Sequence, residues 1–174
     1  RGYSWEIPQC DRLWQDIEAF INNGSKDPYF FGTIILDCSN SDKFGEYSLI
    51  DGQQRTTTFL LLLKAMQLRL DGALQNNKSS NEDSERLKSS MRRYHDDIIQ
   101  ILFKADEDKK FDILKSWNTT DNIVILENKS INEPYKDELT LILKAKNFEE
   151  AEKGAIRTLF DKFHLGECSD EIGR

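Results

Sequence analysis

Cysteine and histidine, which build the commonest disulfide and metal sites, are scarce in this sequence. The chain contains three cysteines and two histidines. Cys10, Cys38 and Cys168 lie far apart, and they have neither an even number nor the spacing of zinc ligands. We therefore expect reduced thiols in a cytoplasmic protein.

Long apolar runs and an excess of positive charge are also missing. No stretch of about 18 apolar residues occurs, as a membrane-spanning helix would need, and we expect no membrane partner. The net charge of −7 argues against a protein that coats nucleic acid through a general basic field, and a local basic groove stays open. With 174 residues and 38% hydrophobic content, the chain is long enough for a domain with a real core.

Hydrophobic spacing predicts a mixed α/β first half. Residues 10–24 have the apolar period of an amphipathic helix, and the short aromatic and β-branched stretch 29–37 predicts a strand that is buried on both faces. A second strand is expected to end at Ile50. Residues 58–70 are apolar on nearly all sides and predict a central, enclosed helix. The polar stretch 76–85 predicts a loop or a partly disordered excursion.

The second half predicts mainly helices, with one strand among them. We expect helices at 90–103, 134–147 and 148–163 and a strand at 121–130. On the first of these helices the inward residues should be Tyr94, Ile98, Ile101 and Leu102. Trp14 and Trp117 are assigned to the core or its rim, and His95, in an acidic helix, to the surface.

Between the second strand and the central helix stand five polar or flexible residues, Asp51-Gly52-Gln53-Gln54-Arg55. Gly52 can supply the sharp turn, and Gln53 to Thr56 then form the first helical turn, which presents unpaired backbone N–H groups. These groups and the positive end of the helix dipole attract an anion such as phosphate. Arg55 would oppose the dipole unless an anion or the Asp51 carboxylate lies nearby.

Each side chain of the pentad has a chemical role available to it. Gln53 and Gln54 can contact phosphate or orient a water, and Asp51 can hold a divalent ion or accept a proton. The alternative is structural: Asp51 caps the helix, Arg55 pairs with an acidic neighbour and the glutamines are exposed. Neither a Walker-type loop nor a G-x-G-x-x-G motif is present.

Four motifs in order give the chain a family resemblance. The first motif, Q-R-x-Y-x-W, is matched without its Gln by Arg1, Tyr3 and Trp5. The second, L-x-x-D-I, is matched by "LWQDI" at 13–17, and the third, y-F-x-G-x-I-x-L, by "YFFGTIIL" at 29–36. The fourth, D-G-Q-Q-R, follows at 51–55. The chain thus resembles the GmrS-type domain of modification-dependent type IV restriction enzymes and related antiphage proteins. Thr56 stands where that family usually has Leu.

The resemblance implies an α+β fold of the ParB/sulfiredoxin-like type, with a small mixed sheet on a central buried helix and a mainly helical segment after it. We expect residues 1–75 to form the core of this domain and residues 76–174 its continuation, truncated at the C-terminus. The implied ligand is a nucleoside triphosphate (NTP) with a divalent cation, Mg²⁺ or Ca²⁺. The implied catalytic residues are Asp51, Gln53, Gln54 and Arg55, the cofactor-binding residues Arg1, Tyr3, Gly52, Arg55 and Thr56, and the metal ligand Asp51.

The preferred interpretation is an NTP-binding and NTP-hydrolysing regulatory domain. In this family the nuclease activity usually belongs to a separate or downstream domain, so the expected partners are an NTP, that nuclease domain, DNA through the full-length protein, and a second copy of the chain. One alternative is a ParB-like DNA-binding or modified-base-sensing module without hydrolysis. Another is an interaction scaffold without chemistry.

Overall fold

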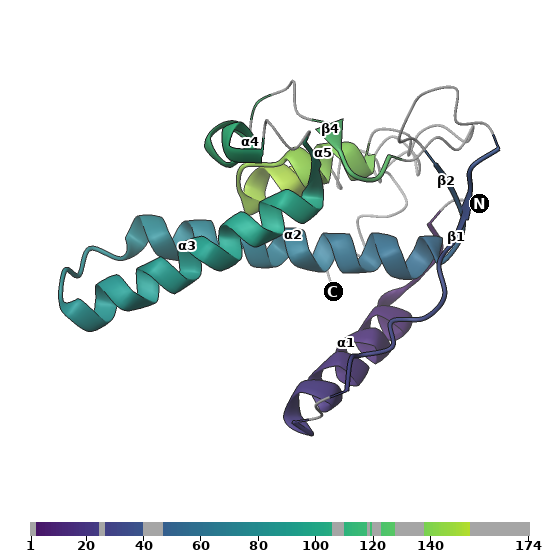
Figure 1. Ribbon diagram of the computed structural model, residues 1–174, viewed down its shortest axis with the longest axis horizontal. Helices are drawn as coiled ribbons and strands as arrows, with labels where there is room; N and C mark the ends of the chain where they lie inside the picture. Colours follow the sequence, from purple (N-terminus) through teal and green to yellow (C-terminus); the bar gives the residue numbers. More distant parts are fainter. Residues whose placement is uncertain are drawn as a thin grey trace, which may run out of the picture. The chain divides into compact units, whose positions relative to one another are not determined.

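The computed structural model describes residues 3–24, 27–39, 47–105, 110–117, 119, 123–127 and 138–153 (Figure 1). In chain order the elements are α1 (Ile7–Asn22), β1 (Ile35–Asp37), β2 (Ser48–Asp51), α2 (Gln53–Asn76), α3 (Glu82–Leu102), β3 (Phe103–Lys104), α4 (Lys110–Ser116), β4 (Ile123–Val124) and α5 (Glu138–Lys144). They fall into two compact units, one reaching Phe59 and the other starting at Leu60, so α2 contributes to both.

Helix α1 of the first unit starts earlier than its apolar period predicts. A capping box joins Glu6 and Gln9, and the Glu6 N–H donates to the Gln9 side chain at 3.1 Å. Pro8 lies in the first turn, where its missing N–H costs no intrahelical bond. Leu13 is the buried residue of this helix, and Gly24 follows it with a positive φ of 60°.

Strands β1 and β2 form an antiparallel pair in which Leu36 lies opposite Leu49. The prediction of a strand over 29–37, buried on both faces, is wrong: the strand covers Ile35–Asp37, and Leu36 is 50% exposed. Residues 28–34 before it form neither a helix nor a strand. The reason lies in their aromatic rings, because Tyr29 packs on Phe20 at 5.1 Å between centroids.

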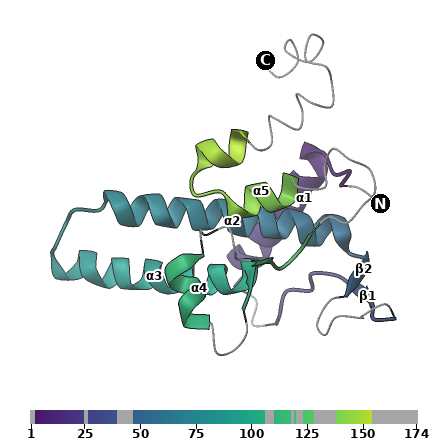
Figure 2. The same cartoon turned by 90° about the horizontal axis from the view of Figure 1, so that it is seen from above.

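Helices α2 and α3 form a hairpin in the second unit, joined by a short connection (Figure 2). The predicted loop at 76–85 is shorter than expected, since α2 reaches Asn76 and α3 begins at Glu82. Asn81 explains the early start of α3: its side chain accepts a hydrogen bond from the Ser84 N–H at 2.8 Å, and acidic residues in the first turn suit the helix dipole.

The core of the second unit lies around the C-terminal half of α3. Strands β3 and β4 pair there in an antiparallel two-residue ladder. Trp117 is buried, as predicted for the core or its rim, whereas Trp14 of the first unit is 48% exposed. The buried cluster consists of Leu60, Ile98, Ile99, Leu102, Phe103, Ile113, Trp117, Val124 and Leu143.

The predicted inward face of α3 is only half correct. Ile98 and Leu102 are buried, but Tyr94 is 53% and Ile101 47% exposed. These two residues lie to the side of the buried face, which follows His95, Ile99 and Leu102. The apolar surface of α3 is therefore wider than the described core covers.

A polar group of side chains is enclosed in the second unit. Lys64 donates to the Gln67 side-chain carbonyl at 2.8 Å, and its ammonium lies 4.4 Å from the centroid of the Trp117 ring. The amide of Gln67 lies 3.2 Å from Nε2 of His95. The prediction that His95 is a surface residue is wrong: it is 8% exposed because Gln67 and Trp117 cover it.

These elements confirm the α+β class, with two small antiparallel sheets and a majority of helix. The ParB/sulfiredoxin-like arrangement and the domain bounds 1–75 and 76–174 stay predictions. Of the expected elements, residues 128–137 and those beyond 153 lie outside the described residues. Over the described part of the chain, no helix has the length and apolar character that crossing a membrane requires.

Candidate functional site

The pentad lies where β2 runs into α2, as the sequence predicts (Figure 1). Gly52 has a φ of 88°, in the region that favours glycine, and α2 begins at the next residue. The first intrahelical bond runs from the Thr56 N–H to the Gly52 carbonyl at 2.9 Å. The N–H groups of Gln53 and Arg55 precede this bond and so have no partner within the helix.

Gln54 holds the N-terminal segment against this turn. Its side-chain oxygen accepts from the backbone N–H of Ser4 at 2.7 Å and from that of Trp5 at 3.2 Å. Tyr3 adds a bond one turn further along α2, where its hydroxyl lies 2.7 Å from Oγ1 of Thr58. The segment that carries the first family motif therefore lies beside the pentad, while Arg1 is outside the described residues.

The hydroxyl of Tyr3 is held as a neutral donor. Thr58 donates its own proton to the Gln54 backbone carbonyl at 2.9 Å, so Tyr3 donates to Thr58. Burial and a 3.5 Å contact with the Cys10 sulfur raise the pKa of Tyr3 to about 12. A phenol in this state can position the segment but cannot act as a base near neutral pH.

Gln53 and Asp51 are each fixed by one backbone group. The amide of Gln53 donates to the Leu49 carbonyl at 2.6 Å, which ties the first turn of α2 back to β2. Oδ1 of Asp51 accepts from the Gly52 N–H at 2.8 Å. Asp51 thus stabilises the turn, and within the described residues its second oxygen has no hydrogen-bond donor.

Arg55 does not pair with Asp51. Its guanidinium carbon lies 6.0 Å from the centroid of the Phe31 ring, and the group covers Gly32. A Cβ atom at Gly32 would come within 1.8 Å of Nη1 of Arg55, and Gly32 itself has a φ of 104°. Within the described residues Arg55 has no carboxylate partner, although a cation in the first turn of a helix opposes its dipole.

Thr56 carries a hydroxyl with unmet hydrogen-bonding capacity. Its Oγ1 is buried and has no partner among the described residues. Such a group costs roughly 1–3 kcal/mol unless something binds it. Among the described residues, the turn therefore carries a buried hydroxyl without a hydrogen-bond partner, next in the sequence to an arginine without a carboxylate partner.

The sequence alone did not predict that the Arg55 guanidinium lies against Phe31 and Gly32. Phe31 and Gly32 belong to the "YFFGTIIL" motif, which reads as a strand when only β-propensity is considered. A glycine inside an aromatic run is a signal for a close backbone approach, and here the approaching group is the guanidinium. The described residues contain no cluster of three or more His, Cys, Asp or Glu suited to a metal ion.

A protein-family model described as the GmrSD restriction endonuclease, N-terminal domain, matches residues 1–165. The match includes all four motifs and residues of both compact units. No curated protein and no solved structure gives a match.

Proposed function

Because this chain belongs to the family of GmrSD restriction endonuclease N-terminal domains, we propose that it is an NTP-binding and NTP-hydrolysing regulatory domain of a DNA restriction and defence protein, with its site at residues 51–56. The family connects the chain with restriction of DNA. The nucleotide chemistry is our proposal, and it rests on the residues at the start of α2.

The observation that supports this proposal is that two consecutive residues lack the partners that their charge and their hydroxyl group would need. Arg55 is a cation at the positive end of a helix without a carboxylate partner in the described structure, and the Thr56 hydroxyl is buried without a partner. An anion with several oxygen acceptors would offset both costs, and the positive end of the helix dipole favours it as well. A triphosphate has this chemistry.

The residues present fit such a ligand, and they differ in their roles. Arg55 would clamp a phosphate, Gly52 would keep the turn open, and Thr56 would donate its hydroxyl. Asp51 would use its second oxygen to hold a divalent cation, Mg²⁺ or Ca²⁺, or to orient a water. When bound, the cation neutralises phosphate charge.

The two glutamines and the N-terminal segment would shape the site. Gln53 and Gln54 are fixed on Leu49, Ser4 and Trp5, so we assign them mainly to positioning. Tyr3 would line the site from the N-terminal segment, and we extend this assignment to Arg1. Cleavage of DNA would belong to a separate or downstream domain, and the NTP would control it in the cytoplasm.

Arg55→Ala in the full-length protein tests the site. A charged hydrogen bond to phosphate is worth about 1.5–3 kcal/mol, so NTP affinity should fall roughly tenfold to a hundredfold. The affinity is measured by calorimetric titration with each of the four NTPs and Mg²⁺. Gly32→Ala should lower it too, because the new methyl group displaces the guanidinium.

The matched control is Arg86→Ala, which removes an exposed arginine that pairs with Glu82. It should bind NTPs as the wild type does. Asp51→Asn should keep much of the binding and lower the hydrolysis rate, since it changes the cation or water position. If Arg55→Ala and Asp51→Asn both hydrolyse NTPs at the wild-type rate and only melt at lower temperature, the pentad is a structural cap and the proposal is wrong.

A further inference from the structure

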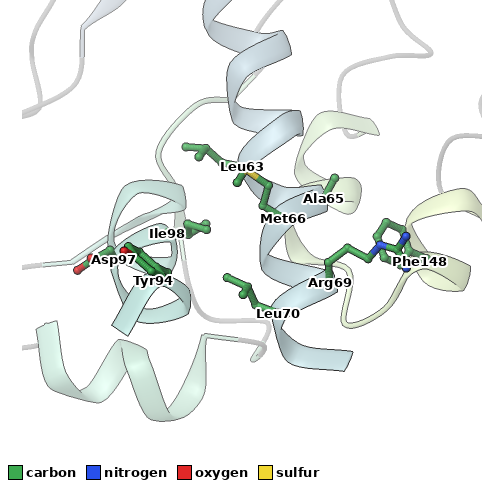
Figure 3. Close-up of a pocket in the computed structure, with 9 residues that line it drawn as sticks. All are labelled: Leu63, Ala65, Met66, Arg69, Leu70, Tyr94, Asp97, Ile98 and Phe148. Carbon is green, nitrogen blue, oxygen red and sulfur yellow. The ribbon is translucent and has the colours of Figure 1, made fainter. Parts of the chain in front are cut away.

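A buried polar network joins α2 to α3, beside an apolar groove that the two helices line (Figure 3). The groove has a volume of about 680 Å³, and its walls include Met66 of α2 and Tyr94 of α3. Gln67 and His95, the next residue on each helix, are buried. The contact between α2 and α3 therefore has a polar part next to its apolar part.

The Gln67 amide connects two ionisable side chains. Its oxygen accepts a hydrogen bond from Nζ of Lys64 at 2.8 Å, and its nitrogen lies 3.2 Å from Nε2 of His95. Gln67 has no exposed surface, and Lys64 and His95 are 1% and 8% exposed. Water therefore has little access to replace either bond, and each is stronger than it would be at the surface.

These bonds define which nitrogen of His95 carries the proton. An ammonium can only donate, so the Gln67 oxygen faces Lys64 and its NH₂ group donates to Nε2 of His95. Nε2 is then unprotonated, and the ring proton lies on Nδ1, which is 3.3 Å from the Asp96 carboxylate. Contacts on both sides of the ring thus assign the same neutral tautomer.

A second proton does not fit this arrangement. If His95 takes up a proton while Lys64 keeps its own, the new Nε2–H faces the NH₂ group of Gln67, and two donors meet. Reversing the Gln67 amide would turn the NH₂ group to the Lys64 ammonium, where two donors meet again. The bonded network can therefore hold one added proton, on Lys64 or on His95, but not two.

Asp71 offers a protonated His95 another acceptor. Its Oδ1 lies 3.8 Å from Nε2 of His95, and its side chain is 27% exposed. Asp71 follows Gln67 by four residues on α2, which is about one helical turn. A His95 that leaves Gln67 for Asp71 would therefore move its bond by one turn along α2.

The groups around the network come from four segments. Asp96 faces Nδ1 of His95 from α3 itself, and Asp71 of α2 faces Nε2. Asp71 and Glu150 both attract the Lys64 ammonium, while burial lowers the pKa of Lys64 to about 7. The uncharged ring of Trp117, which follows α4, contacts both Lys64 and His95.

We propose that Lys64, Gln67 and His95 form an acid-sensitive latch between α2 and α3. With one added proton the Gln67–His95 bond holds, and a second proton, taken from solvent, breaks it and turns Nε2–H of His95 to Asp71. The latch borders the groove, so its opening changes the surroundings of Met66. No residue of the Asp51–Thr56 turn takes part, and the inference is independent of nucleotide binding.

Nitrogen-15 NMR of the purified chain, from about pH 7.5 to about pH 5, tests the latch. Near neutral pH His95 should be the Nδ1–H tautomer, with a scalar coupling across the hydrogen bond from Gln67 to Nε2. At the acid end that coupling should be absent, and Nε2–H should exchange slowly because Asp71 accepts it. A coupling that persists after His95 is protonated overturns the proposal, as does a His95 that stays neutral throughout.

Two variants separate the latch from a general effect of charge. Asp71→Ala removes the acceptor of Nε2–H, so at about pH 5 its exchange with water should quicken by at least roughly tenfold. In a Lys64→Met background Gln67 is free to reverse and accept from Nε2–H, so Asp71→Ala should have little effect there. The matched control is Asp96→Ala, which removes a charge on the Nδ1 side of the same ring and should leave the Nε2–H exchange rate unchanged.

Equal acceleration by Asp71→Ala with and without Lys64 would overturn the latch, because exclusion of the second proton requires the ammonium. An equal acceleration by Asp96→Ala would do the same, since it would show an effect of charge alone. Circular dichroism confirms that each variant is folded. If Lys64→Met does not fold, the wild-type coupling and tautomer still decide the proposal.

Discussion

The two compact units of this chain are held together by different forces. In the first unit Leu13 is the buried hydrophobic residue of the described part, and Ile7, Ile21 and Phe30 are between 68% and 82% exposed. The second unit has a continuous buried cluster in which Ile99, Leu102 and Leu143 have no exposed surface. A buried apolar cluster therefore stabilises the second unit, whereas side-chain hydrogen bonds and contacts between aromatic rings hold the first.

The difference shows how the candidate site is supported. Gln54 holds Ser4 and Trp5, Gln53 holds Leu49, and these bonds start from the first turn of α2. The later turns of the same helix enter the core of the second unit with Leu60 and Leu68. The first turn of α2 is thus attached to its neighbours by polar contacts, while later turns of the same helix contribute to an apolar core.

Leu102→Ala should give the largest loss of stability. The side chain is fully buried in the core of the second unit, and truncating a buried leucine costs about 2–5 kcal/mol through lost contacts and a cavity. Urea unfolding measures the change as a lower midpoint. A loss below about 1 kcal/mol would mean that the second unit is not the stabilising core, and the comparison would fail.

Lys64 should make the stability of the second unit depend on pH. Burial lowers the pKa of Lys64 from its ordinary 10.5 to about 7, against the attraction of Asp71 and Glu150. Between about pH 7 and 10.5 the unfolded chain binds a proton on Lys64 that the folded chain lacks, so stability rises with pH in this window, by at most about 1.4 kcal/mol per pH unit. Below about pH 7 both states are protonated and the contribution is constant.

The comparison with Lys64→Met isolates this effect. Urea midpoints are measured from about pH 6.5 to about pH 9, and taking the difference between the two proteins removes every contribution that they share. The wild-type midpoint should climb relative to that of Lys64→Met. Parallel curves would show that Lys64 keeps its proton in the folded core.

The sequence predicted some of these features because they are local. The turn at Gly52 and the start of α2 follow from a glycine and polar residues between two apolar runs, and both are confirmed. The state of Arg55 depends on Phe31 and Gly32, which lie more than twenty positions away in the chain. No periodicity within either segment reports such a contact.

Contacts between residues distant in the sequence also explain the two wrong predictions. His95 stands among charged residues in the sequence, but Gln67 of α2 and Trp117, which follows α4, enclose it. Residues 29–34 have the composition of a strand, yet their rings pack on one another and on Phe20 and Phe59 instead of pairing in a sheet. In both cases contacts with residues distant in the sequence, and not the local composition, determined the structure.

Gln54→Ala should have a smaller effect that is confined to the first unit. The variant leaves the N–H groups of Ser4 and Trp5 without their acceptor, and because water can reach them the loss should be about 1 kcal/mol. Hydrogen exchange should show faster exchange at these two amides. Gln54→Glu keeps an acceptor oxygen and should keep their protection. Unchanged protection in Gln54→Ala, together with lost NTP binding, would make Gln54 a ligand contact and not a positioning residue.

Leu36→Ala should have the smallest effect, although it makes the same chemical change as Leu102→Ala. Leu36 lies in β1 and is 50% exposed, so its truncation leaves little cavity, and substitutions at such positions usually change stability by less than about 0.5 kcal/mol. Its backbone pairing with Leu49 does not depend on the side chain. Urea unfolding of the two leucine variants side by side is the sharpest form of the comparison. Equal losses would show that the β1–β2 pair is covered by a part of the protein outside the described residues, and the first unit would then have an apolar core of its own.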